Sequence, residues 1–148
     1  MPLPQIAETT IQQYATPQIF ERGNEYYQQR RVTSLVLRGT TLYAEVEGSE
    51  EFPYLVLCTF DADGPGEASC TCPYEWGGWC KHIVAACLCL IHEPETIEER
   101  PPLEKQLSDL TREQLQAVLL KLAERAPALV ETIDNEVEMQ RPVLAEMT

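Results

Sequence analysis

Hydrophobic and polar residues alternate between positions 31 and 47, and a period of two is typical of β-strands. Gly39 and Thr40 interrupt the alternation, which predicts a turn between two strands. In the second strand the apolar residues Leu42, Ala44 and Val46 alternate with larger or charged ones. The pattern therefore predicts the start of a meander.

A third strand is expected over residues 52–60, which are apolar on both sides. We expect it to lie centrally, covered on one face by a helix and on the other by the following loop or another helix. Cys58 lies in this strand as a predicted core residue. After a turn rich in glycine and proline, a short fourth strand is expected over residues 67–70.

Helices are predicted on both sides of these strands. Residues 4–15 favour a short helix, and Thr16 followed by Pro17 marks the start of a second, because threonine caps helices and proline suits their first position. Gly23 weakens this second helix, which predicts a close approach by another backbone. Residues 81–91 form a helix too apolar to be exposed.

The last third of the chain is predicted to be helical. Thr111 and Gln114 have the spacing of a capping box, and Pro127 marks the start of another helix. The first of these helices carries an apolar stripe formed by Leu115, Val118, Leu119 and Leu122. We expect the two helices to form an antiparallel hairpin, because their connection is tight.

The fold class that follows is α+β, with a small antiparallel sheet of three to four strands, N-terminal helices, and a loop leading into a buried helix. Residues 1–92 are predicted to form the first module. Residues 93–102 are rich in glutamate and proline and are predicted to be a linker. Residues 103–148 form the predicted C-terminal helical region.

The strongest chemical signal lies in the loop before the buried helix. Cys70, Cys72, Cys80 and His82 form a Cys-x-Cys pair and a Cys-x-His pair separated by seven residues, among them a proline and two glycines that let the loop bend. Three thiolates and one imidazole fill a tetrahedral zinc shell, and such a closed shell is structural because a catalytic zinc keeps one position open. We therefore predict one structural Zn²⁺ and no catalytic residue.

Two alternatives concern the cysteines. The pattern at residues 70–82 could consist of disulfide or core cysteines and an unrelated histidine, but a Cys-x-Cys disulfide closes a strained ring, and the N-terminus resembles no signal peptide. Cys87, Cys89 and His92 could be spare ligands, but the helical spacing of Cys87 with its apolar neighbours favours a core stripe.

At these residues the sequence resembles the SWIM zinc-finger family, whose pattern is Cys-x-Cys, a variable gap and Cys-x-His. The resemblance, which is to bacterial members, covers about residues 15–91 and includes Phe20-Glu21-Arg22-Gly23, Tyr26-Tyr27 and Lys81-His82-Ile83-Val84-Ala85. It implies a zinc-stabilised module that serves DNA or protein interaction. In bacteria such modules often accompany helicase-like ATPases.

The charge of the chain bears on its partners. With 24 acidic and 11 basic residues, the net charge is −13, which on average repels phosphate backbones. Residues 1–38 carry four arginines against three glutamates, whereas residues 39–100 carry two bases against twelve acids. Only the N-terminal part could face nucleic acid, and its arginines are more simply explained as a solvated helix face.

Composition also bears on location. No run of residues is long and apolar enough for a membrane span, and the first residues lack the basic and apolar regions of a leader. We therefore expect a cytoplasmic protein with no membrane partner.

The sequence bears on three classes of function. The acidic balance favours a module that binds a protein partner, and Trp76 and Trp79 in the loop are candidate contacts, one shielding the metal and the other partly exposed. The alternative, a nucleic-acid binder, would have to use Arg22, Arg30 and Arg31, helped by the loop or Lys81. An enzyme is disfavoured, because the thiols are spent on metal and no glutamate has the spacing of a zinc-water base. We expect no small-molecule substrate.

Overall fold

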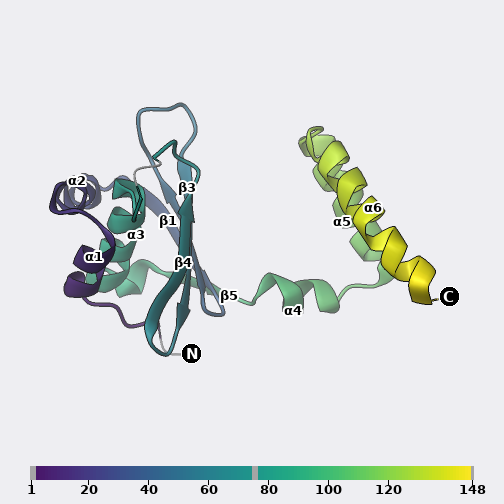
Figure 1. Cartoon of the computed structure of the whole chain (residues 1–148), viewed down its shortest axis with the longest axis horizontal. Helices are drawn as coiled ribbons and strands as arrows, with labels where there is room; N and C mark the ends of the chain where they lie inside the picture. The colour runs from purple at the N-terminus through teal and green to yellow at the C-terminus, as the bar shows by residue number, and fades with distance from the viewer. Residues whose placement is uncertain (1–2, 75–76, 148) are drawn as a thin grey trace. The chain divides into compact units, whose positions relative to one another are not determined.

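The structure is a computed structural model that describes residues 3–74 and 77–147, with side chains described up to residue 141. The chain divides into two compact units, Met1–Pro102 and Leu103–Thr148. The first unit (Figure 1) contains α1 (Glu8–Tyr14), α2 (Pro17–Gln28), β1 (Val32–Arg38), β2 (Thr41–Val46), β3 (Tyr54–Asp61), β4 (Gly64–Cys70), α3 (Lys81–His92), the 3₁₀ turn η1 (Pro94–Thr96) and β5 (Glu98–Arg100). The second contains α4 (Leu103–Ser108), α5 (Arg112–Arg125) and α6 (Leu129–Met147).

The sheet of the first unit has five strands in the order β4-β3-β2-β1-β5. Strands β1 to β4 form the predicted antiparallel meander, and the α+β class is confirmed. The fifth strand lies in the segment 93–102, which was predicted to be a linker, and it runs parallel to β1 with Glu98 opposite Val36. This strand has no alternating apolar pattern by which the sequence could reveal it, because its three residues are all charged and exposed. Parallel pairing with β1 requires only its backbone.

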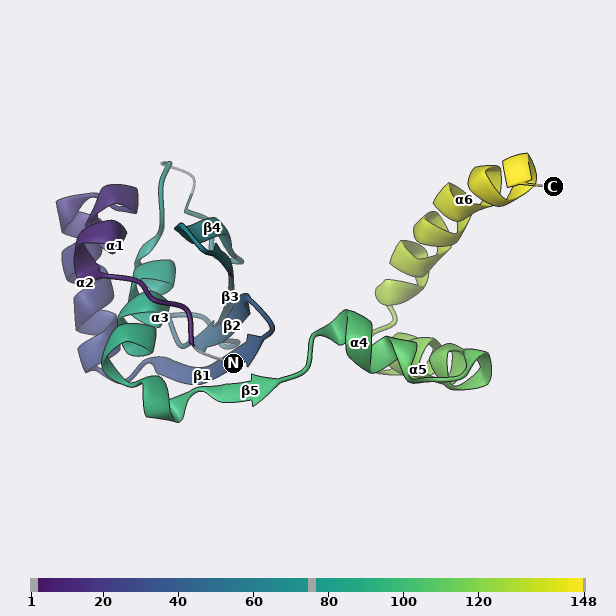
Figure 2. The same ribbon diagram turned by 90° about the horizontal axis from the view of Figure 1, so that it is seen from below.

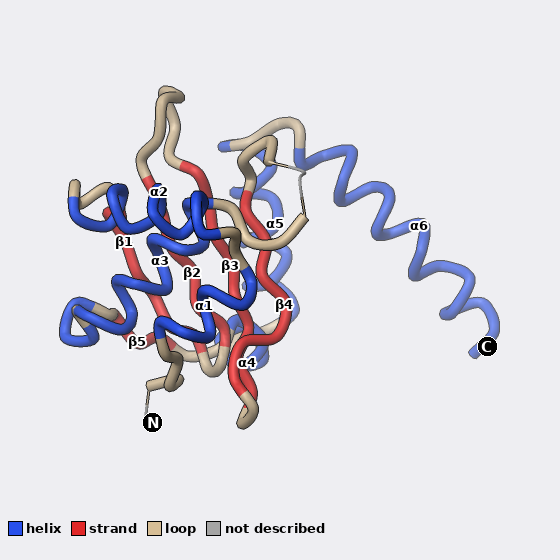
Figure 3. The backbone as a smooth tube through the Cα atoms, turned by 60° about the vertical axis from the view of Figure 1, so that its left-hand side comes forward, coloured by secondary structure: helices blue, strands red, loops and turns tan. Residues whose placement is uncertain are grey.

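Helices α1, α2 and α3 cover one face of this sheet, as Figures 1 and 3 show. Every residue of α3 from His82 to Leu90 is buried, which confirms the expected buried helix. Its neighbours in the sheet include the aligned inward residues Leu35, Ala44 and Val56. The zinc-binding segment therefore leads into the best-packed element of the unit.

Gly23 allows α2 to lie against α3. A Cβ atom added to Gly23 would stand 2.3 Å from Cγ1 and 2.5 Å from Cβ of the fully buried Val84. The close backbone approach predicted from this glycine is confirmed. Helix α2 begins where Thr16 predicts, since its hydroxyl accepts a hydrogen bond from the Ile19 N–H.

The opposite face of the sheet is open in the first unit. Tyr43, Leu55 and Leu57 are 38%, 52% and 36% exposed, and Tyr43 lies directly opposite Leu57 across β2 and β3. Within the first unit, the described elements do not provide the cover that was predicted for this second face of β3. An apolar outer row can pack on itself across neighbouring strands without being buried by another layer.

The second unit is helical, as predicted, and α5 begins with the predicted capping box. The Thr111 hydroxyl accepts from the Gln114 N–H at 3.1 Å, and the Gln114 amide oxygen accepts from the Thr111 N–H at 2.9 Å. Helices α5 and α6 diverge from the connection between them (Figures 2 and 3), so the antiparallel packing expected for a hairpin is not seen. Pro127 accounts for the break, because it keeps Ala126 out of the helical region, at φ −134° and ψ 84°.

None of residues 103–141 is buried. Among the helices that the structure describes, none combines the length and apolar character that crossing a membrane requires.

Candidate metal centre

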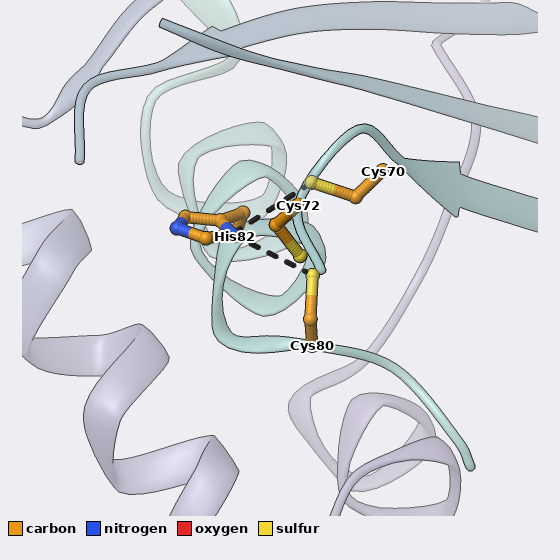
Figure 4. A group of neighbouring side chains, drawn as sticks. All are labelled: Cys70, Cys72, Cys80 and His82. Atoms are coloured by element: carbon orange, nitrogen blue, oxygen red, sulfur yellow. Dashed lines mark hydrogen bonds between the residues drawn. The ribbon is translucent and has the colours of Figure 1, made fainter. Parts of the chain in front are cut away.

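Three structural elements deliver the four predicted metal ligands. Cys70 is the last residue of β4, and Cys72 follows it in the turn. Cys80 is the residue that precedes α3, and His82 lies in the first turn of that helix. The end of an edge strand and the start of the buried helix thus bring two sequence pairs to one place (Figure 4).

The four side chains converge on a single point. One ligand atom from each of Cys70, Cys72, Cys80 and His82 lies within 4.8 Å of all the others. Nδ1 of His82 is 3.7 Å from Sγ of Cys70 and 3.8 Å from Sγ of Cys80. A sulfur and a nitrogen bound to one tetrahedral zinc stand roughly 3.6 Å apart, so both distances fit the edges of such a tetrahedron. The cluster is compatible with one structural zinc ion.

Hydrogen bonds among the thiols set their protonation. A hydrogen bond from Cys70 lowers the pKa of Cys80 to about 4, against the opposing effect of burial. The same interaction raises the pKa of Cys70 above its ordinary value, and burial raises that of Cys72. Without metal, Cys80 is therefore the thiolate of the cluster, and Cys70 and Cys72 remain protonated thiols that donate hydrogen bonds to it. Zinc favours all three thiolates, so its binding releases the remaining protons.

The His82 ring is held between two tyrosines. Its centroid lies 4.4 Å from that of Tyr54 and 5.5 Å from that of Tyr26. Its side chain is only 3% exposed, with Nδ1 toward the sulfurs and Nε2 without a hydrogen-bond partner among the described residues (Figure 4). A buried imidazole with an unpaired nitrogen is costly, and coordination through Nδ1 would offset part of that cost. No sequence pattern predicts that Tyr54 contacts His82, because this contact depends on the register of β3 against β2.

Residues 54–91 match the SWIM zinc finger family. The chain carries a SWIM zinc finger. The match begins at Tyr54 and includes all four clustered residues, together with β3, β4 and nearly all of α3.

Several curated proteins are similar to the chain over a longer region. The zinc finger SWIM domain-containing protein 8 homolog of Drosophila melanogaster is 34% identical over 109 residues, which are 73% of this chain and 5% of that protein. The human zinc finger SWIM domain-containing protein 8 is 34% identical over 112 residues, again 73% of this chain and 6% of that protein. An uncharacterized protein of Methanocaldococcus jannaschii is 29% identical over 106 residues, 72% of this chain and 42% of its own length.

The chain thus covers only a small part of the animal proteins that it matches. No solved structure shows significant similarity to it.

Trp79, at the end of the zinc-binding loop, packs against the last residue of α1. Its ring stacks on that of Tyr14 at 4.7 Å between centroids, and the backbone N–H of Trp79 donates to the Tyr14 carbonyl at 2.8 Å. The side chain is only 6% exposed, so Trp79 has a packing role and leaves little surface for the partner contact suggested for it. Gly78 permits this arrangement with a φ of +72° and no Cβ against the same carbonyl. Trp76, the other predicted contact, lies outside the described residues.

The three arginines proposed as contacts do not share one site. Arg22 lines a groove beside the SWIM finger, together with Lys81. Arg31 lies over the Tyr26 ring, which lines the same groove. Arg30 adopts a positive φ of 59° in the turn after α2 and lines a different cavity.

Cysteines and histidines outside the cluster have other contacts. Cys58 and Cys87 are fully buried and interact with each other in the core, as the stripe pattern indicated. Cys89 donates toward a carboxylate oxygen of Glu93, and His92 pairs with Glu8 at 2.7 Å. The four-residue cluster does not include them.

Proposed function

We propose that the chain is a non-catalytic, zinc-stabilised module that mediates contacts with other proteins. The observation that carries the proposal is the uncovered apolar stripe of α5. Val118, Leu119 and Leu122 are 39%, 48% and 45% exposed on one side of a helix. Burying a leucine or valine side chain stabilises by about 1.5 to 3 kcal/mol, so a matching partner surface would gain substantially from this stripe.

The metal centre supports a non-catalytic role. Three sulfurs and one nitrogen complete a tetrahedral zinc shell and leave no coordination position for water or substrate. Hydrolytic zinc sites require that open position. The finger then serves to hold β4 and α3 together, and the interaction surface lies on α5.

Net charge supports a protein partner over nucleic acid. A chain at −13 repels phosphate backbones at long range, whereas an apolar stripe is insensitive to that field. Binding to nucleic acid is the second candidate function. It is favoured by one observation: Arg31 and Lys81 both lie over the Tyr26 ring, and Arg22 lines the same groove as that ring.

The test is a photo-crosslinking experiment with the full chain, using a photoreactive residue in place of Gln116 and mass spectrometry of the adducts. The variant Leu119→Gln should reduce the yield of a specific protein adduct about tenfold, because one buried leucine contributes at least that much. Leu120→Gln is the matched control. It makes the same change one residue along α5, off the stripe, at a site that is 63% exposed.

A parallel assay measures retention of a random DNA duplex at low and moderate salt. We expect no salt-sensitive retention. The proposal fails if adduct yields are equal for Leu119→Gln and Leu120→Gln while the duplex is retained in a salt-sensitive manner that depends on Arg22.

A further inference from the structure

A groove of about 710 Å³ lies beside the metal centre. One wall comes from α2, through Ile19, Arg22 and Tyr26, and the other walls come from the segments around Tyr54 and Lys81. Pro73 and Tyr74 of the zinc-binding loop also line the groove, as do Ser49 and Glu50 of the β2–β3 connection. The predicted zinc ligands Cys72, Cys80 and His82 line it as well. Two basic and three tyrosine side chains thus share one cavity of an acidic chain.

The basic side chains gather around one ring. Cζ of Arg31 lies 4.7 Å and Nζ of Lys81 lies 4.9 Å from the centroid of Tyr26. Each contact is a cation–π interaction, and one tyrosine thus holds two positive charges. Arg22 lines the same groove one helical turn before Tyr26.

None of these three cations forms an ion pair with a residue that the structure describes. Among the described residues, the ion pairs join His92 to Glu8, Arg100 to Glu98 and Arg141 to Glu138. Arg31 instead donates from Nε to the Gln29 amide oxygen at 2.7 Å. In a chain with 24 acidic and 11 basic residues, Arg22 and Lys81 thus line one groove without an ion pair to a described carboxylate. Such cations can attract a negatively charged group of a ligand.

We propose that this groove binds a short acidic segment of a partner protein, with carboxylates at Arg22 and Lys81 and an apolar side chain against Ile19 and Tyr54. This inference rests on the proposed role in protein interaction and names a partner chemistry for one surface of the module. Arginine suits this task because its planar fork of donors matches a carboxylate.

A peptide fits the surroundings better than a nucleic acid does. Glu50 lines the groove itself, and Glu21 and Glu25 flank Arg22 on the adjoining surface of α2. A nucleic acid carries a charge on every nucleotide, so the phosphates on either side of the groove would meet these carboxylates. An acidic peptide can place its carboxylates at the cations and neutral residues beyond them.

The experiment measures fluorescence anisotropy of a labelled peptide in which Asp and Glu residues flank a single leucine, added to the full zinc-loaded chain. A peptide of the same length with Asn and Gln in place of the acids is the ligand control. The double variant Arg22→Gln, Lys81→Gln should weaken binding of the acidic peptide about tenfold, whereas Arg125→Gln should change it less than about twofold. Arg125 lies at the end of α5 in the other unit and is not a lining residue of the groove, so its substitution serves as a control for the change in net charge.

The outcomes separate cleanly. Tighter binding of the acidic peptide than of its amide counterpart, lost in the double variant at unchanged zinc content and melting temperature, supports the proposal. Equal binding of the two peptides, or no effect of the double variant, overturns it. Tighter binding of single-stranded or duplex DNA than of the acidic peptide also overturns it and assigns the groove to nucleic acid. None of these results alters the α5 crosslinking assay, so the two proposals fail independently.

Discussion

The contact between α2 and α3 makes a sharp prediction for Gly23→Ala. The new Cβ would stand 2.3 Å from Cγ1 and 2.5 Å from Cβ of Val84, and 3.0 Å from the carbonyl oxygen of Lys81. Val84 is fully buried and β-branched, so it has no free space into which to rotate. The two helices must therefore separate.

The expected magnitude follows from two opposing effects. Overpacking of a core costs about 1 to 3 kcal/mol, and distances this short place Gly23→Ala at the upper end. Alanine in place of a helical glycine gains about 1 kcal/mol of helix propensity. The net loss is about 2 kcal/mol in the free energy of unfolding. For a unit of this size, that loss lowers the melting temperature by roughly 8 to 16 °C.

Denaturation by guanidinium, followed by tryptophan fluorescence and circular dichroism at a fixed free zinc concentration, measures the effect. Zinc must be held constant because a ligand of the native state adds to its stability by mass action. Asn24→Ala is the matched control, since it introduces the same side chain one residue along α2 and should be neutral or slightly stabilising. A Gly23→Ala variant as stable as Asn24→Ala would refute the close packing of α2 on α3.

Three further changes test other parts of the structure. Gly78→Ala should lower the melting temperature more than Gly77→Ala, because both have positive φ but only the former also meets a backbone carbonyl, at 2.6 Å. Burial raises the pKa of Cys89 from 9.0 to about 11, so the contribution of this thiol to stability is complete below pH 9 and is lost as the pH rises toward 11. In a plot of the urea midpoint against pH, Cys89→Ala should therefore reduce the slope between pH 9 and pH 11, and an unchanged slope would contradict the assignment. Thr111→Ala should cost about 1 kcal/mol of α5 stability, which would reduce the helical ellipticity of the chain. Thr111→Ser should retain the ellipticity, because serine also caps helices.

The sequence predicts the features that depend on local patterns. The spacing of Cys70, Cys72, Cys80 and His82 indicated one metal cluster, and the structure brings their ligand atoms together. Thr16 and Thr111 marked helix starts correctly, because capping depends on residues only three apart. The buried helix was visible because it is apolar on every side.

Features that depend on distant contacts were missed. Strand β5 has only charged residues, and the backbone edge of β1 alone decides its pairing. Tyr54 reaches His82 because of the β2–β3 register, which no short pattern encodes. The exposure of Leu55 and Leu57 could not be predicted either, because a strand that is apolar on both sides has the same sequence pattern whether one or both of its faces are covered.

We expect zinc bound by the SWIM finger to hold β4 to α3, and metal analysis is the direct test of this role. The assay is zinc content per chain, together with the melting temperature, for protein purified without chelator. Structural zinc contributes on the order of 10 to 16 kcal/mol near neutral pH, which is comparable with the stability of a whole domain. We expect about one zinc per chain. His82→Ala should lose this zinc together with the cooperative melting of the first unit, and His92→Ala should retain both. A chain without zinc, or a His82→Ala variant with unchanged zinc content and melting temperature, would contradict it.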